Sequence, residues 1–416
     1  MRYRLRSSSY FLAIFATWLA LSQTAVATAD VAVRGDAILV DGQPFMPRGA
    51  SGRVRLGELQ ALGANTVRTY GEEGDAVMVE AERLGLKVIL GFWLEHPRRG
   101  FDYGNRAMVD AQLARLRAFV LRHRESPALL MWGIGNEVES ELTDDSRVWP
   151  AIDEAARLVK SLDPDHPTIA VLAETGADKV RKIVTQAPHI DVLGLNSYGD
   201  AILTLHDRAR AQGWNGPIVI TELGAIGQWQ TGKTPWGAAL EPTSTDKAAS
   251  LRRYLHETQR QSLGQMLFLW GQKQEVTPTF HSLLLASGEW TEAAEVMAEF
   301  WGGATPDDNR APRISALAFE GDNAWPRSAD RTASVAGHDP DDDVVSYEWR
   351  VLRESSDLGK AGDAETVPPD FSHGLQHIGD RRVTIAGLPP GNYRLFVTVR
   401  DNRGAAATGN LPFQVQ

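Results

Sequence analysis

The feature that most constrains this chain is a regular alternation of short apolar segments with longer amphipathic ones. Eight strand-like segments recur between residues 44 and 301, and helical stretches separate them. They cover residues 45–50, 66–70, 87–92, 128–134, 168–172, 190–195, 217–221 and 266–270. This alternation predicts a parallel sheet, because parallel strands need crossover connections. Eight units over this length predict a closed (β/α)₈ barrel, a fold of about 250 residues.

The segments between the strands have the period of amphipathic helices. Leu113, Leu116 and Val120, after the third strand, are spaced three or four positions apart. Gly85 stands just past a helix end, where a left-handed cap lets the chain turn into the next strand. Ahead of the barrel, residues 32–40 and the Asp-Gly turn after them predict a small hairpin that closes the barrel floor.

The N-terminal segment has the pattern of an export signal. Three arginines within the first six residues precede an apolar stretch, residues 10–21, which is too short to span about 30 Å of hydrocarbon. Ala27 and Ala29 supply the small residues that signal peptidase requires. We expect residues 1–29 to be a cleaved signal peptide, which implies a periplasmic or secreted protein without a membrane span in the mature chain. An uncleaved anchor is the alternative.

The composition changes after residue 301. Residues 302–311 are rich in turn-forming residues and predict a linker. In residues 312–416 the helical period disappears, and alternating apolar runs at 344–351 and 393–399 are bounded by Pro, Gly and Asp. We therefore assign residues 30–301 to the barrel domain and residues 312–416 to an all-β, Ig-like sandwich.

The C-terminal segment resembles Ig-like modules of the polycystic-kidney-disease type. Residues 338–349 are similar to the first hairpin of that family, and residues 393–401 to its later strands. Such modules act as spacers or accessory platforms, so the resemblance assigns no chemistry here. We interpret an aspartate cluster in the hairpin as a solvated turn, with Ca²⁺ binding as the alternative. The cluster consists of Asp339, Asp341, Asp342 and Asp343.

Composition excludes several kinds of site. The chain has no cysteine, which rules out disulfides, a thiol nucleophile and metal–thiolate clusters. Its formal net charge is −10 and no Lys/Arg block occurs beyond the extreme N-terminus, which argues against nucleic acid as a partner. The ten histidines show no HExxH spacing, and no GxGxxG or Walker sequence follows a strand. We expect no metal and no cofactor; the oligomeric state stays open.

A glutamate follows each of two predicted strands. Glu137 follows the fourth strand and Glu222 follows the seventh. Polar residues directly after barrel strands line the C-terminal mouth, where the active sites of this fold lie. Retaining glycosidases need two carboxyl groups about 5–5.5 Å apart, one as acid and one as nucleophile. The alternative, two unrelated surface glutamates, does not explain why both lie at this face.

These motifs resemble clan A of the glycoside hydrolases, the four-seven superfamily that includes families 2, 5 and 17. Gly135-Asn136-Glu137 matches its acid/base motif, and Thr221-Glu222 matches its nucleophile motif. The resemblance covers the barrel. It implies a retaining glycosidase in which Glu137 is the acid/base and Glu222 is the nucleophile.

The resemblance implies roles for four further residues. Asn136 matches the residue that bonds the sugar 2-hydroxyl, and Arg68 matches the arginine that keeps the nucleophile ionised. Tyr198 matches the tyrosine that donates a hydrogen bond to the nucleophile, and Trp270 matches the aromatic floor of the sugar site. For Arg68 a surface ion pair is the alternative role, and for Trp270 a position in the core.

Three other candidates rest on their positions after strands. Trp93 follows the third strand, where its ring can stack on a sugar, and Trp229 lies in the long loop after the seventh strand. Glu174 follows the fifth strand and is interpreted as a substrate contact or a member of an ion pair.

The sequence therefore predicts an exported retaining β-glycoside hydrolase. Residues 65–71 and 277–280 look closer to relatives that act on β-glucans, and a barrel with an Ig-like module is similar to some endo-β-1,3-glucanases. We expect an oligo- or polysaccharide substrate, a β-glucan with β-1,3 links. A β-glucan transglycosylase, or a catalytically silent glycan-binding barrel, is the alternative, and galactosides and mannans stay possible substrates.

Overall fold

The computed structural model describes residues 30–416 except residues 72–73, 262 and 361. The predicted signal peptide lies outside the described residues. Within the described part of the chain, no helix is both long and apolar enough to cross a membrane.

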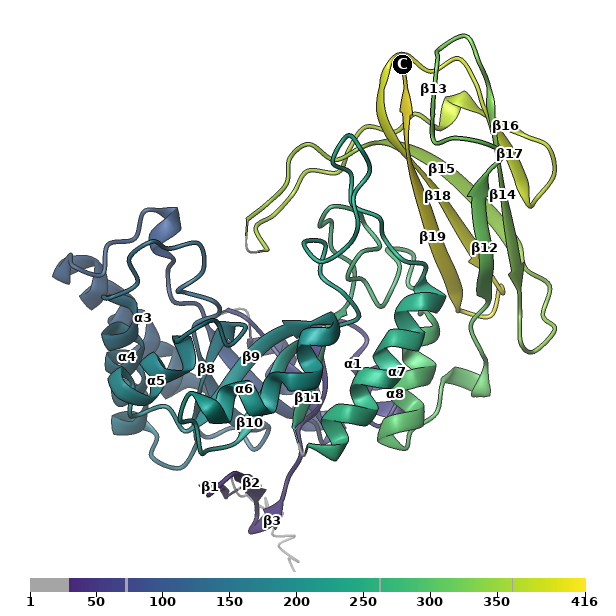
Figure 1. Ribbon diagram of the computed structural model, residues 1–416. Helices are drawn as coiled ribbons and strands as arrows, with labels where there is room; N and C mark the ends of the chain where they lie inside the picture. The colour runs from purple at the N-terminus through teal and green to yellow at the C-terminus, as the bar shows by residue number, and fades with distance from the viewer. Residues whose placement is uncertain (1–29, 72–73, 262, 361) are drawn as a thin grey trace, which may run out of the picture.

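Eight parallel strands close into a barrel in the order β10-β11-β4-β5-β6-β7-β8-β9. Helices lie around this barrel (Figure 1). The strands are β4 (Arg48–Gly52), β5 (Thr66–Arg68), β6 (Lys87–Phe92), β7 (Leu129–Ile134), β8 (Thr168–Ala173), β9 (Val192–Tyr198), β10 (Ile218–Gly224) and β11 (Gly264–Trp270). Each of the eight predicted strand segments overlaps one of them, so the predicted barrel is confirmed.

One α-helix follows each barrel strand. The helices are α1 (Leu56–Ala61), α2 (Asp75–Leu84), α3 (Arg106–His123), α4 (Val148–Leu162), α5 (Lys179–Gln186), α6 (Leu205–Ala211), α7 (Ser244–Arg260) and α8 (Glu292–Trp301). Their apolar faces pack on the outside of the barrel in one large core, to which Leu116 and Val120 of α3 contribute. Gly85 ends α2 with a φ of 72°, the left-handed cap that its position predicts.

The barrel floor is covered by a small three-stranded sheet of β1 (Val31–Arg34), β2 (Ala37–Val40) and β3 (Gln43–Pro44) (Figure 1). Val31 and Ile38 of this sheet are buried against inward-facing barrel residues such as Ile89 and Met266. Apolar side chains thus fill the barrel axis at this end, which leaves the opposite end, at the carboxyl ends of the strands, for polar residues.

The C-terminal segment forms two packed four-stranded sheets, with the orders β12-β14-β17-β16 and β13-β19-β18-β15. Their strands are β12 (Arg313–Phe319), β13 (Ala324–Trp325), β14 (Arg331–His338), β15 (Ser346–Arg353), β16 (Leu375–His377), β17 (Arg382–Ile385), β18 (Gly391–Arg400) and β19 (Ala406–Val415). Trp325, Trp349, Tyr393 and Phe413 fill the space between the sheets. The predicted sandwich is therefore confirmed.

The sandwich is fastened to the barrel by buried polar contacts as well as by packing. Arg394 of the sandwich is 1% exposed, and its guanidinium donates to the Ala239 carbonyl of the barrel domain at 2.9 Å. Within the sandwich it also donates to Glu354 at 2.6 Å. Asn410 donates at 2.6 Å to the buried Glu241. These two hydrogen bonds join buried polar groups of the sandwich to buried groups of the barrel domain, so the two domains share one interface.

Candidate active site

A pocket of about 700 Å³ opens at the carboxyl ends of the barrel strands, where it was expected. It contains both predicted catalytic glutamates, Glu137 and Glu222. Other lining residues come from the ends of seven barrel strands, β5 to β11, or from the loops that follow them. They include Tyr70, Trp93, Asn136, Glu174, Asn196, Tyr198, Trp229, Phe268, Lys273 and Glu275.

Glu222 lies within β10 and is held by hydrogen-bond donors. The Tyr198 hydroxyl donates to its Oε2 at 2.6 Å, and the Tyr70 hydroxyl donates to its Oε1 at 2.9 Å. The Arg68 guanidinium lies 3.4 Å from the same Oε1. Burial keeps the pKa of each tyrosine well above its ordinary value, so both remain donors. Glu222 is 7% exposed, and two hydrogen-bond donors and one cation surround its carboxyl group. Such surroundings favour the ionised form of a carboxyl group.

Arg68 connects the segments that carry the two predicted catalytic glutamates. It is 2% exposed, so it is not the surface ion pair that was its alternative role. It donates to the Thr221 carbonyl at 2.8 Å and to Asn136 Oδ1 at 2.6 Å. One guanidinium therefore orients the backbone before Glu222 and the side chain before Glu137.

Glu137 has the opposite environment. It follows β7 in a tight turn, with φ of 72° at Gly135 and 50° at Glu137 itself, and this turn directs the side chain into the pocket. One donor reaches it, Asn196 Nδ2, at 2.7 Å from Oε1. Burial, and then the negative charge of Glu222, raise the pKa of Glu137 to about 8. Glu137 is therefore largely protonated at neutral pH.

The pocket also contains the predicted binding residues Asn136, Tyr198, Trp93, Glu174 and Trp229. Trp229 is 60% exposed, and its ring meets that of Tyr198 edge to face at 5.3 Å. Glu174 is paired with Arg208, which corresponds to the ion-pair role considered for it. The Trp93 ring stacks on His96, which leaves part of the Trp93 ring at the pocket wall.

The position predicted for Trp270 is wrong. This side chain is 1% exposed and packs in the core between barrel and helices, which was its alternative position. The reason is a register shift between Leu267 and Trp270 where β11 pairs with β4, which breaks the alternation of side chains along the strand. Phe268 lines the pocket instead.

Some pocket residues were not singled out from the sequence. Tyr70 stands two positions beyond Arg68, at the end of a predicted strand, and that position could have indicated it. Asn196 begins the Asn-Ser-Tyr segment of which only Tyr198 was selected. The sandwich contributes Gly359, Lys360 and Gly362, for which the sequence carries no signal.

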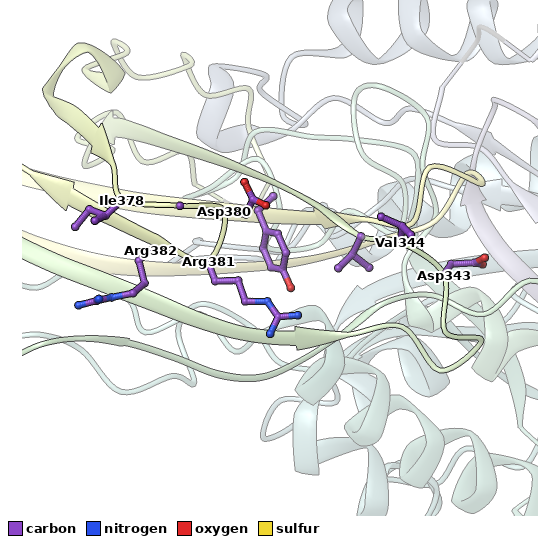
Figure 2. Close-up of a pocket in the computed structure, with 9 residues that line it drawn as sticks. Asp343, Val344, Ile378, Asp380, Arg381 and Arg382 are labelled. Atoms are coloured by element: carbon purple, nitrogen blue, oxygen red, sulfur yellow. The ribbon is translucent and has the colours of Figure 1, made fainter.

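A second hollow lies on the sandwich, away from the glutamates (Figure 2). Val344, Ile378 and Arg381 are among its lining residues, and the Arg381 guanidinium lies 5.6 Å from the Tyr347 ring centroid. Close to it, carboxylate oxygens of three of the clustered aspartates lie within 4.8 Å of one another. These are Asp339, Asp341 and Asp343.

Comparisons with known proteins agree on the barrel. No protein-family model matches the chain. Human β-glucuronidase is 32% identical over 148 residues, which are 34% of this chain and 20% of that protein. Mannan endo-1,4-β-mannosidase F of Aspergillus clavatus is 28% identical over 125 residues, 26% of this chain and 28% of that protein. The chain thus matches less than a third of the length of these two relatives.

Solved structures match a larger share of the fold. A β-D-glucuronidase from Dictyoglomus thermophilum superposes on 66% of this chain and 53% of its own, with a TM-score of 0.53 and 17% identity. β-Glucuronidase 2 of Bacteroides uniformis covers 94% of this chain and 48% of its own, with a TM-score of 0.53 and 14% identity. In its barrel and in these stretches of sequence the chain is thus similar to glycoside hydrolases of clan A, the group that its motifs resemble.

Proposed function

We propose that the protein hydrolyses β-glycosidic bonds with retention of configuration. The observation that carries this proposal is the contrast between two carboxyl groups in one pocket. Glu137 is largely protonated at neutral pH, while Glu222 is surrounded by donors and a cation. A pair with separated protonation states is what general acid catalysis and nucleophilic attack require together.

In the first step a Glu222 oxygen attacks the anomeric carbon and forms a glycosyl ester. The glycosidic C–O bond breaks, and the departing oxygen takes the proton of Glu137. In the second step Glu137 removes a proton from water, the water oxygen attacks the anomeric carbon, and the bond to Glu222 breaks. The products are a free alcohol and a sugar with its original anomeric configuration.

The charge of Glu222 also explains how Glu137 changes role. That charge is one of the two main causes of the raised pKa of Glu137. It disappears when Glu222 becomes an ester, so the pKa of Glu137 falls in the intermediate. The same carboxyl is then suited to act as a base toward water.

The pocket chemistry supports a carbohydrate as the substrate. Trp93, Trp229 and Phe268 present aromatic surface, on which the apolar faces of sugar rings stack, beside acceptors and donors for hydroxyl groups. We retain a β-glucan, with β-1,3 links, as the first candidate, because of the motifs at residues 65–71 and 277–280. The relatives named β-glucuronidase and mannan endo-1,4-β-mannosidase make β-glucuronides and β-mannans the next candidates.

A substrate panel tests the proposal. Purified protein is incubated with laminarin, lichenan, mannan, galactan and 4-nitrophenyl β-glycosides, including the β-D-glucuronide, and the products are followed by ¹H NMR. We expect turnover of at least one substrate with the β-anomer formed first. Initial release of the α-anomer would contradict retention, and binding without turnover would favour a glycan-binding barrel.

Transglycosylation differs from hydrolysis only in the second step, where a sugar hydroxyl replaces water. Adding a laminari-oligosaccharide acceptor to the same reaction separates the two. Products longer than the donor would favour a transglycosylase, while unchanged release of reducing sugar would favour hydrolysis.

We also propose that the protein is exported. The support is the pattern of residues 1–29 in the sequence. N-terminal sequencing of the protein recovered from a bacterial host should begin at Asp30, and a retained Met1 would contradict cleavage.

A further inference from the structure

The connection between β15 and the short helix η4 (Ser372–Gly374), residues 354–371, extends out of the sandwich toward the barrel (Figure 1). We call it the sandwich loop. Three of its residues, Gly359, Lys360 and Gly362, line the same pocket as Glu137 and Glu222. A sandwich that acted only as a spacer would have no reason to place residues beside Glu137 and Glu222. The loop therefore indicates a further role for the sandwich.

The loop is docked on one side to the segment that follows β6. The Asp363 carboxylate binds both Arg98, at 2.5 and 2.9 Å, and Arg99. Hydrogen bonds from Arg98 are the main cause that lowers the pKa of Asp363 to about 2. The Arg99 guanidinium in turn lies 5.3 Å from the centroid of the Trp93 ring in the pocket wall.

On the other side the loop is docked to the segment that follows β11. Lys273 Nζ donates to the Gly362 carbonyl at 3.0 Å, and the Val276 amide donates to Glu365 Oε2 at 2.7 Å. The other oxygen of Glu365 accepts the Gly359 amide at 3.0 Å, which shapes the loop tip itself. Contacts on both sides hold Gly362 and Asp363 beside the pocket.

The order of strands tells which part of the pocket the loop covers. β4 and β5 lie between β11 and β6 in the barrel, so a loop docked beyond β6 and β11 crosses the mouth on the β4 and β5 side. Glu137 follows β7, on the other flank. Because the acid must face the oxygen of the leaving group, that group lies toward Glu137, and the sugar that receives the nucleophile extends toward the loop.

We propose that the sandwich loop forms the end wall of the site for this sugar, the glycone, and that the Lys360 ammonium binds its oxygen atoms. The proposal rests on the proposed function and deepens it. Among the described residues no hydrogen bond or ion pair engages the Lys360 ammonium, and its side chain is exposed at the pocket. Its three N–H donors suit sugar hydroxyl oxygens, and a carboxylate on the glycone would bind more strongly.

The test compares Lys360→Ala, Lys360→Arg and Asp363→Ala with the wild-type protein on the panel substrate that it turns over fastest. Lys233→Ala is the matched control, because Lys233 is an exposed lysine of another long loop and does not line the pocket. Dissociation constants for laminaritriose and mannotriose are measured in parallel by tryptophan fluorescence, with each variant combined with Glu222→Gln.

We expect Lys360→Ala to raise KM about five- to tenfold with kcat within about twofold, the loss of one charged hydrogen bond outside the reacting centre. Lys360→Arg should restore most of the affinity, and Asp363→Ala, which releases the loop, should raise KM as well. A KM for Lys360→Ala within twofold of wild type, equal to that of Lys233→Ala, would overturn the proposal.

The binding measurement separates this inference from the proposed function. If the wild-type protein binds a trisaccharide but turns over no substrate, the proposed hydrolysis is contradicted. The dissociation constant of the Lys360→Ala variant would then still test whether Lys360 binds the sugar. Absence of both binding and turnover would overturn both.

Discussion

The hydroxyl of Tyr198 donates a 2.6 Å hydrogen bond to Oε2 of Glu222. The two residues come from neighbouring strands, β9 and β10, whose pairing places Tyr198 opposite Gly224. A register shift between Ile220 and Glu222 turns the glutamate toward the tyrosine rather than repeating the regular alternation. An irregularity in β10 thus brings the proposed nucleophile next to Tyr198.

Replacing Tyr198 with Phe tests this hydrogen bond. We expect kcat/KM to fall about 10- to 100-fold, since a hydrogen bond to a charged group contributes about 1.5–3 kcal/mol. The ring contacts with Trp229, Phe268 and His281 remain, so the melting temperature should change little. Unchanged kinetics would show that Tyr198 does not position Glu222.

Replacing Glu222 with Gln should remove the covalent step while the fold persists. An amide is a poor nucleophile, so we expect kcat to fall by at least about 10³-fold. Circular dichroism would check the fold. A variant that keeps most of its activity would refute the assignment of the nucleophile.

Replacing Glu137 with Ala should affect substrates unequally. A poor leaving group needs the proton of Glu137, whereas an activated aryl group leaves without it. We expect a small effect on formation of the glycosyl ester from an aryl glycoside, followed by slow hydrolysis that added azide accelerates. Absence of azide rescue and of a glycosyl azide product would argue against the acid/base role.

The pH profile should report the protonation of Glu137. The acid acts in its protonated form and its pKa is raised to about 8, so its contribution is present below that pH and is lost as the pH rises through it. We expect kcat/KM on a substrate with a poor leaving group to decline above about pH 8. Removing the charge of Glu222 with Glu222→Gln should lower the pKa of Glu137, which ¹³C NMR titration would detect. An unshifted pKa would show that the two carboxyls do not interact.

Stability should depend on the polar contacts between barrel and sandwich. Arg394→Met removes the donor to the Ala239 carbonyl of the barrel domain. It also leaves Glu354 of the sandwich, whose side chain is 10% exposed, without its guanidinium partner. Breaking a buried pair in this way costs about 3–5 kcal/mol. We expect a melting temperature several degrees lower, with Arg382→Met, at a half-exposed pair on the sandwich surface, as the control. Equal melting temperatures would show that the contacts of Arg394 do not limit stability.

Much of this architecture follows from local patterns in the chain. The eight barrel strands and the two glutamates at their ends were predicted because strand periodicity and its end points are properties of neighbouring residues. The same reasoning failed for Trp270, since a register shift in β11 depends on how that strand pairs with β4. Tyr70 and Asn196 were missed for a similar reason, because their importance lies in contacts with residues more than 50 positions away.

The sequence by itself determined the barrel, the sandwich and the two carboxyls proposed for catalysis. Tertiary structure alone decided their chemical difference. Burial, and then the charge of Glu222, raise the pKa of Glu137, while two tyrosines and Arg68 surround Glu222. It also decided that Lys360, 138 positions beyond Glu222 in the chain, lines the same pocket. The physical reason is that desolvation and charge interaction depend on distance in space, which local periodicity does not encode.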